Sequence, residues 1–460
     1  MMKKILTASS KTKLSNFFST IKENSKETQN TLTLYMNYLV VTYAFVLPIT
    51  WKGRSTIFLF ILFLFLARRN FIYYLKDSFK NPIVQSFLLY LFIHFLWLFG
   101  TDNFTQAIKM IDYAQYAVIP LIFLSFVTKE FSYKIIASFA AGVFLSEIIS
   151  YLVRFQVLPQ KLDLFSKNLY TILDIHDPTP FLYHSQYAIT LSVVIALFIL
   201  KLLNKNNSLQ IKIISFIFIA TATINLSLIG GRSGYLSYIF LAITVIILKF
   251  KSKALVPLIF TLLIILTISY TAYNNSPMFK SRIDYSIETI NKLNHNIYDF
   301  NSSLGTRIAF WYYGLMVVEE NLLLGVGTGD QLDEVKTLVP STDTYITQHP
   351  HLHSVYLSQL VQFGIIGLLV YLNIFFQIFK YNYRDENAKE IAIIISVGIM
   401  IATLTETFYT KYYLAVFGTM LSAVLATKTM SFTYQNTNIK KELSAYFVIF
   451  ITTSLLIFIQ

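Results

Sequence analysis

The sequence predicts an all-α membrane protein that crosses the bilayer many times. Of its 460 residues, 55% are hydrophobic and only 13% are charged, whereas soluble domains carry roughly a quarter charged residues. Apolar runs long enough for a helix to cross about 30 Å of hydrocarbon recur along nearly the whole chain. The runs are continuously apolar rather than alternating at every second residue, which disfavours a transmembrane β-barrel.

The apolar runs predict about twelve membrane-spanning helices, or thirteen if the last run also crosses. They cover residues 34–50, 55–67, 83–100, 112–127, 133–153, 181–203, 209–229, 233–250, 254–273, 354–379, 389–408, 412–428 and 444–459. The run at 55–67 is short for a span, and residues 444–459 either cross the membrane or pack along it.

Lysine and arginine are concentrated in alternate connections, and this orients the chain. If residues 1–33 form a cytoplasmic tail, most of the 37 basic residues fall on the same side, as the positive-inside rule expects. We therefore expect spanning helices over 34–273, a large periplasmic loop over 274–353 and further spanning helices over 354–460. The net charge of +13 then reflects topology, and it does not indicate nucleic-acid binding, because the basic residues are scattered over short loops without an RNA-binding motif.

Two absences narrow the chemistry further. The chain has no cysteine, which excludes disulfides, thiolate nucleophiles and cysteine metal sites. The N-terminal tail shows no compact apolar core with a small-residue cleavage site, so we expect no signal peptide there.

The long loop contains a predicted helix. The segment "SSLGTRIAFWYYGLMVVEENLLLGVGTG" begins with hydroxyl residues suited to an N-cap, continues as an amphipathic helix and stops at Gly325, Gly327 and Gly329. We interpret these glycines as turn residues rather than a phosphate-binding loop, because no strand precedes them.

Two arginines at the membrane edge are candidate anion ligands. Arg232 lies in "SLIGGRSGYLS", where the glycines allow the backbone to approach a ligand closely. Arg307 opens the loop helix, where a cation meets an unfavourable helix dipole unless an anion is near. The alternative is that Arg232 extends to the membrane interface and Arg307 is an exposed loop residue.

Three of the seven histidines stand at alternate positions before a long apolar helix, in "QHPHLHSVYLSQLVQFGIIG". Pro350 disfavours helix at His349, so the segment is expected to become helical near His353 or Ser354. A neutral imidazole at His353 is then placed to accept a proton. A zinc site of His349, His351 and His353 is an alternative, although the spacing matches no zinc motif; an interfacial histidine without catalytic role is another.

The order and spacing of three segments resemble the O-antigen ligase and polymerase superfamily of bacterial polytopic membrane proteins. They are "SLIGGRSGYLSYIF", "GTRIAFWYYGLMVVEENLLLGVGTG" and "LHSVYLSQLVQFGIIGLLVYL". The resemblance covers residues 220–375, and the first half of the chain is similar only in its succession of spans. Two departures from the family pattern occur: Gly-Arg-Ser-Gly replaces Ser-Arg-Gly at Arg232, and Ser354 replaces the asparagine that follows the histidine.

This resemblance implies a fold of the GT-C type and a glycan transfer in the bacterial inner membrane, with the site facing the periplasm. The donor would be a glycan on undecaprenyl diphosphate, and the reaction would need no cofactor, metal or nucleotide sugar. Arg232 and Arg307 would bind the diphosphate through paired hydrogen bonds, and His353 would be the base that activates the acceptor hydroxyl, with inversion at the anomeric carbon.

Other polar residues are candidates for supporting this site. His184, Glu406 and Trp311, the tryptophan of the family pattern, could contact the acceptor or hold the site together. Glu147 lies within a predicted span, where a carboxyl group is costly and is usually paired or functional. Residues 174–177 are interpreted as loop residues before Pro178.

Within the superfamily the ligase branch is favoured, because the loop of about eighty residues and its single terminal histidine resemble that branch. A ligase joins the glycan to lipid A–core oligosaccharide, a polymerase joins glycan repeats, and a protein O-oligosaccharyltransferase joins glycan to serine or threonine. A transporter of polyprenyl-linked glycans is the alternative from another class. It predicts internal repeats and charges near the bilayer midplane, whereas the polar residues singled out here gather at one face.

Overall fold

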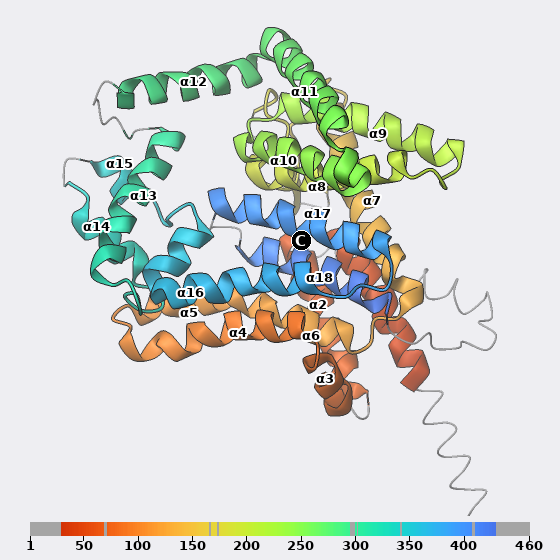
Figure 1. The fold of residues 1–460 in the computed structure, drawn as a ribbon, viewed down its shortest axis with the longest axis horizontal. Coiled ribbons are helices and arrows are strands. Elements are labelled where there is room, and N and C mark those ends of the chain that lie inside the picture. Colours follow the sequence, from red (N-terminus) through yellow and green to blue (C-terminus); the bar gives the residue numbers. More distant parts are fainter. Residues whose placement is uncertain are drawn as a thin grey trace, which may run out of the picture.

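A computed structural model describes residues 29–68, 71–164, 167–172, 174–294, 300, 302–340, 343–406 and 410–428. The described chain is almost wholly helical, with one short two-stranded hairpin. It is an all-α architecture, as the sequence predicts (Figure 1).

The described residues open with a helix over 29–46. The elements that follow are α2 (Trp51–Ala67), α3 (Phe71–Phe79), α4 (Pro82–Leu96), η1 (Trp97–Gly100), α5 (Phe104–Ala114), η2 (Gln115–Val118), α6 (Ile119–Leu124), α7 (Lys129–Arg154), β1 (Lys161–Leu164), β2 (Lys167–Thr171), α8 (His184–Leu203), α9 (Leu209–Leu228), α10 (Arg232–Phe250), η3 (Lys251–Lys253), α11 (Leu255–Asn275), α12 (Pro277–Asn294), α13 (Ser303–Glu320), α14 (Gln331–Leu338), α15 (Thr344–Thr347), α16 (Val355–Lys380), α17 (Glu386–Thr405) and α18 (Thr410–Ala426).

Nine helices in the described part of the chain are long and apolar enough to cross a membrane, or up to ten if the bent pair α2 and α3 forms one span. The predicted count of twelve or thirteen is not confirmed. The run predicted at 412–428 forms α18, which at 17 residues is shorter than these spans, and the run at 444–459 lies outside the described residues. The span predicted at 112–127 instead runs over Phe104–Leu124, with a 3-10 turn at its middle.

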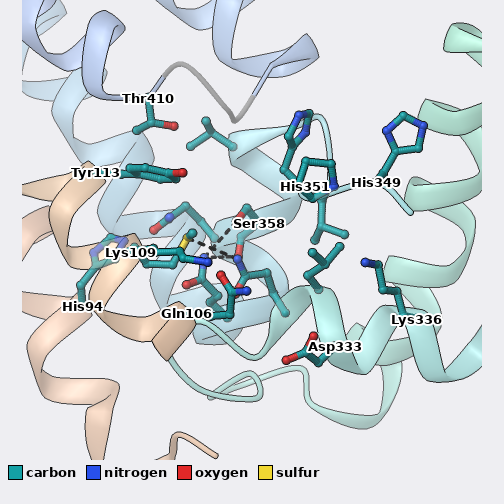
Figure 2. Close-up of a pocket in the computed structure, with 18 of the residues that line it drawn as sticks. His94, Gln106, Lys109, Tyr113, Asp333, Lys336, His349, His351, Ser358 and Thr410 are labelled. Atoms are coloured by element: carbon teal, nitrogen blue, oxygen red, sulfur yellow. Dashed lines mark hydrogen bonds between the residues drawn. The ribbon is translucent and has the colours of Figure 1, made fainter. Parts of the chain in front are cut away.

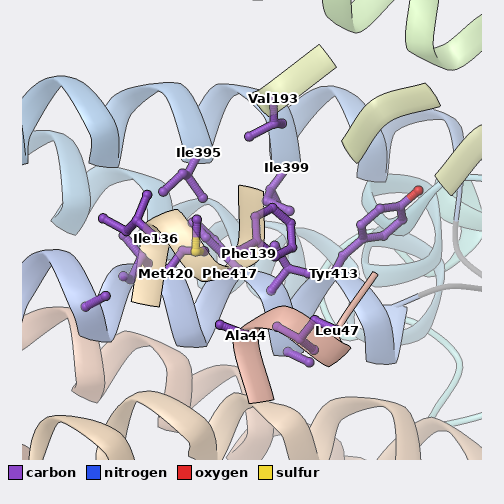
Figure 3. Close-up of a cluster of buried hydrophobic side chains, with 14 of the residues drawn as sticks. Ala44, Leu47, Ile136, Phe139, Val193, Ile395, Ile399, Tyr413, Phe417 and Met420 are labelled. Carbon is purple, nitrogen blue, oxygen red and sulfur yellow. The ribbon is translucent and has the colours of Figure 1, made fainter. Parts of the chain in front are cut away.

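The centre of the bundle is α18, whose residues are buried almost without exception. It packs against α17, α7 and α6, and Figure 3 shows the apolar side chains that meet there, among them Phe139 of α7, Ile399 of α17 and Phe417 of α18. The opposite case is α11, of which only 6% of the apolar window is buried. Its exposed isoleucine, leucine and phenylalanine side chains suit contact with lipid tails.

The segment predicted as a large loop, residues 274–353, contains the four helices α12 to α15. Figure 1 shows α13, α14 and α15 gathered at one end of α16, with α12 joining them to α11. They have an apolar core of their own, which includes Phe310, Val335 and Leu357. Ser302 caps α13 by accepting a hydrogen bond from the Gly305 N–H at 2.9 Å, so the helix begins where the sequence places its cap.

The connection from 321 to 330 fastens these helices to the bundle through main-chain hydrogen bonds. Val326 N–H donates to Val361 O at 3.0 Å, and Ile365 N–H donates to Leu322 O at 2.8 Å. The carbonyl groups of α16 are free to pair with the connection because α16 breaks at Gly364, where φ is 62° and ψ is −157°. Gly325, Gly327 and Gly329 all have positive φ, which confirms their interpretation as turn residues.

Two of the glycines around Arg232, Gly231 and Gly234, pack against α8. A Cβ atom at Gly234 would lie 2.2 Å from the Ala188 Cβ, and one at Gly231 would lie 2.5 Å from His184 O. Whether the glycines also let the backbone approach a ligand stays a prediction. They let α10 approach α8 closely, and that approach fixes the position of Arg232 at the start of α10.

Gly364→Ala should destabilise the protein. Its Cβ atom would meet the Leu323 carbonyl carbon at 2.4 Å, on a residue with φ of 62°, and strain of this kind costs about 1–3 kcal/mol before any clash is counted. Thermal unfolding in detergent should show a midpoint several degrees below that of the wild type. Gly100→Ala is the matched control, because a Cβ there has no atom within 4 Å; equal midpoints for the two variants would contradict the role given to Gly364.

Candidate functional site

Three arginines from separate elements converge at the end of the bundle that carries the loop helices. Arg232 begins α10, Arg282 lies in α12 and Arg307 lies in α13. The charges of Arg282 and Arg307 both act on Arg232. Arg232 and Arg307 were candidates from the sequence. Arg282 was not, because its surrounding residues form an ordinary polar helix with no motif.

Arg232 is hydrogen-bonded to a neighbouring helix, and Arg282 lies close enough to Asp177 for their charges to interact. The Arg232 Nη1 donates to Ser286 Oγ of α12 at 2.9 Å. The Arg282 Nη2 and the Asp177 Oδ2 lie 2.8 and 3.0 Å from the place where a Gly230 side chain would begin. The glycine at position 230 leaves room for this guanidinium and carboxylate together, whereas a Cβ atom there would require one of these flexible side chains to move.

Arg307 is paired with Glu406, which ends α17. The Arg307 Nη2 lies 3.0 Å from the Glu406 Oε1, and its Nε donates to Thr405 O at 3.2 Å. Burial raises the pKa of Glu406 above its usual value, and the charge of Arg307 offsets only part of this increase. The arginine lies in the second turn of α13 rather than at its opening, and its Nη1 reaches back to Ser303 O at 2.7 Å. Glu406 supplies the anion that the sequence analysis expected near Arg307.

Asp177 and His184 form a second pair beside the arginines. The His184 Nδ1 lies 3.4 Å from the Asp177 Oδ2, and the Gly230 N–H donates to the Asp177 Oδ1 at 2.9 Å. Burial by itself would raise the pKa of Asp177, but the hydrogen bonds from His184 and Gly230 and the charges of His184 and Arg282 lower it below its usual value. The interpretation of Asp177 as a loop residue is therefore incomplete, because its carboxylate joins the loop to the arginines.

His353 stands just before α16, not in its first turn. Ser354 is the N-cap, with its Oγ accepting from Leu357 N–H, and His353 has a φ of 56°. A left-handed backbone is uncommon for a residue other than glycine and is found more often at functional sites. Its Nδ1 is buried without a hydrogen-bond partner among the described residues.

The three histidines lie close together. The ring centroid of His353 is 4.1 Å from that of His351 and 5.2 Å from that of His349. Burial lowers the pKa of His353 well below its usual value, and the charges of His351, Arg307 and His349 lower it further. Burial, with the charges of His349 and Arg307, also lowers the pKa of His351 to about 4. All of these effects favour the neutral imidazole at His353.

The sequence left a zinc site of His349, His351 and His353 as an alternative. Within the described ranges, no group of three or more His, Cys, Asp and Glu side chains is arranged to hold a metal ion. The zinc alternative thus has no structural support in this part of the chain.

An apolar pocket of about 540 Å³ lies between α9, α10, α11 and α12. Its lining is almost wholly carbon, from residues such as Leu226, Ile265 and Phe279. Tyr235 and Ile283 also line it, and they come three residues after Arg232 and directly after Arg282. The pocket therefore ends near two of the three arginines.

Trp311 and Glu147 are the two remaining predicted residues. Trp311 packs against the apolar core of the loop helices. Glu147 is buried in α7, and its charge acts on Tyr151 and Tyr187, next to the hydrogen bond from Tyr187 to Asn225. Glu147 thus lies beside a polar network between α7, α8 and α9, and both of its carboxylate oxygens are buried without a hydrogen-bond partner among the described residues.

Comparison with known proteins agrees with these motifs. Residues 216–372 match the family model described as O-antigen ligase. An uncharacterized protein of Haemophilus influenzae is 30% identical over 221 residues, which cover 45% of this chain and 52% of that protein. The chain thus spans about half the length of the curated relative that it matches.

The matched region includes Arg232, Arg282, Arg307 and His353, and it excludes Asp177, His184 and Glu406, which other parts of the chain bring to the same place. Residues 216–372 therefore carry the sequence pattern of the O-antigen ligase family, as the motifs in this part of the chain predict.

Proposed function

We propose that this protein is an O-antigen ligase that transfers a glycan from undecaprenyl diphosphate to the lipid A–core oligosaccharide. The observation that carries the proposal is the meeting of three arginines beside an apolar pocket. An isoprenoid diphosphate has these two parts, a long apolar chain and a compact polyanion.

The arginines would bind the diphosphate. Asp177 and Glu406 are the carboxylates that approach Arg282 and Arg307, so three guanidinium groups face two carboxylates. The excess positive charge favours an anion, and planar guanidinium groups donate paired hydrogen bonds to phosphate oxygens. The isoprenoid chain would lie in the pocket between α9 and α12.

His353 would act as the base. The acceptor oxygen attacks the anomeric carbon from the face opposite the diphosphate, and its proton passes to the neutral imidazole. The bond between the sugar and the phosphate breaks, and its electron pair leaves with the diphosphate. Arg232 and Arg307 would stabilise the charge that develops on the leaving group, and the sugar would be transferred with inversion. His184, held by Asp177, would face the acceptor.

This chemistry would take place on the periplasmic side of the bacterial inner membrane. The loop helices over 274–353 carry Arg282 and Arg307, and the segment ends at His353, so all three groups share one side with the start of α10. The same location suits a polymerase or a protein O-oligosaccharyltransferase, and the acceptor decides among the three.

Removing an arginine or His353 should abolish most of the transfer. With undecaprenyl diphosphate-linked glycan, lipid A–core and EDTA, Arg232→Ala and Arg307→Ala should each lower the rate about 100- to 1000-fold, as loss of a transition-state hydrogen-bond donor does. His353→Ala should lower it about 100-fold or more. Gel analysis of labelled product measures the rate.

The control is Arg384→Ala, because that arginine donates to Thr427 O in another connection; its rate should equal that of the wild type.

Transfer to free glycan instead of lipid A–core would replace the ligase by a polymerase, and transfer to a serine or threonine peptide would replace it by the protein-directed enzyme. Full transfer by the arginine variants, with loss only of carrier movement in vesicles, would favour the transporter.

The ion pair of Arg307 should matter for transfer beyond its effect on stability. In Glu406→Gln, Arg307 keeps its bonds to Thr405 and Ser303 but loses its charged partner, and we expect kcat/KM to fall about ten- to hundredfold. Glu390→Gln is the matched control, because it removes the ion pair to Lys249 at 2.6 Å elsewhere in the bundle. Equal losses of activity in the two variants would show that the effect is one of stability alone.

The pH dependence should lack the acid limb of an ordinary histidine. A histidine with a pKa of about 6.5 is mostly protonated at a pH of about 5.5, and a rate that depends on it falls about tenfold there. The lowered pKa of His353, which faces His349, His351 and Arg307, keeps its imidazole neutral at that pH. The value of kcat/KM, which reports the free enzyme, should therefore stay level between these values, whereas an acid limb near 6.5 would contradict a lowered pKa of His353 in the free enzyme.

A further inference from the structure

A second, polar cavity of about 470 Å³ lies between α4, α5, α14 and the start of α16. Figure 2 shows Lys109 and Tyr113 on one side of it and Lys336, His349 and His351 on the other. None of the three arginines lines this cavity. Its volume lies in the range of small-molecule sites, and the proposed transfer leaves it without a role.

Two buried glutamines give the cavity acceptors for hydrogen bonds. Gln359 of α16 is 2% exposed and Gln331 of α14 is 6% exposed. The Oε1 atoms of both are buried without a hydrogen-bond partner among the described residues. Leaving such a buried acceptor unsatisfied costs about 1–3 kcal/mol, and a ligand that donates hydrogen bonds, such as a sugar hydroxyl, would remove this cost.

The other glutamine of the lining is already engaged. Gln362 Nε2 donates to Ser358 Oγ at 2.9 Å, and its Oε1 accepts from Gly329 N–H at 3.1 Å. This bonding fixes one wall of the cavity against the connection that carries the turn glycines. Unpaired acceptors thus occur at Gln359 and Gln331 because nothing in the described chain reaches them, not because the region is loosely packed.

Two lysines add positive charge to the same cavity. Lys109 of α5 and Lys336 of α14 both line it, together with the carboxylate of Asp333, which accepts from Asn103 Nδ2 at 2.7 Å. Burial lowers the pKa of Lys336, against the charge of Asp333, which raises it. Lys336 is partly buried and Lys109 is exposed. An ammonium group gains from a charge-assisted hydrogen bond to an anion, so the charges favour a ligand with one anionic group.

We propose that this cavity binds an anionic sugar, with its hydroxyls donating to Gln359 and Gln331 and its carboxylate or phosphate on Lys109 and Lys336. The assignment rests on the proposed glycan transfer for its biological meaning, since it names the sugar that lies beside the reaction. His351 lines the cavity, and its ring is 4.1 Å from that of His353. A sugar in the cavity is therefore one imidazole away from the proposed base.

The two sources of such a sugar are an acidic sugar of the donor glycan and a phosphorylated sugar of the acceptor core. Saturation-transfer NMR on the full-length protein in detergent tests both, with glucose, glucuronate and glucose 6-phosphate as probes. Tighter binding of glucuronate identifies a carboxylate sugar, and tighter binding of glucose 6-phosphate identifies a phosphorylated one. The measurement needs no transfer, so it succeeds or fails independently of the proposed function.

Gln359→Met and Lys336→Met should each weaken binding of the preferred probe about tenfold or more. The matched controls are Gln377→Met on the same helix, whose amide bonds Asn373, and Lys80→Met in an exposed ion pair; both should bind as the wild type does. Arg232→Ala should keep the sugar while losing transfer. Glucose binding as tightly as both anionic probes, binding by none of the three, or equal binding by the Gln359 and Lys336 variants and their controls would each overturn the proposal.

Discussion

Three guanidinium groups held at one place repel one another, and this repulsion is the constraint around which the site is built. Two carboxylates, Asp177 and Glu406, offset part of it. They come from the loop before α8 and from the end of α17, so the charges tie together helices that are distant in sequence. These carboxylates stabilise the arrangement without a ligand, and they leave a positive excess that an anion can neutralise.

The fold meets this constraint through close backbone contacts. Gly231 and Gly234 let α10 lie against α8, which places Arg232 beside the His184 end of that helix. The break at Gly364 allows the connection over 321–330 to pair with α16, and the loop helices that carry Arg307 are fastened there. The residues that hold the site together thus include glycines, which make no contact through side chains of their own.

The helical class could be predicted from the sequence because long apolar runs are local features, and short motifs were enough to nominate three candidate site residues. Arg232, Arg307 and His353 each stand in a recognisable segment. Arg282 and Asp177 could not be predicted as site residues, because they meet beside Gly230 only in the folded chain. The three residues come from segments about fifty residues apart or more. The left-handed backbone of His353 was also unpredictable, since no local rule requires it of a histidine. The hairpin of β1 and β2 was missed because its strands are only 4 and 5 residues long.

Binding of a lipid diphosphate by the three arginines can be measured directly, by native mass spectrometry of the purified protein with undecaprenyl diphosphate and without any glycan or acceptor. We expect the wild type to bind the diphosphate. The variants Arg232→Ala, Arg282→Ala and Arg307→Ala should each weaken this binding about tenfold or more. Undecaprenol, which lacks the phosphates, should bind equally weakly to all four proteins. Unchanged affinity for the diphosphate in the three variants would show that these arginines do not bind it.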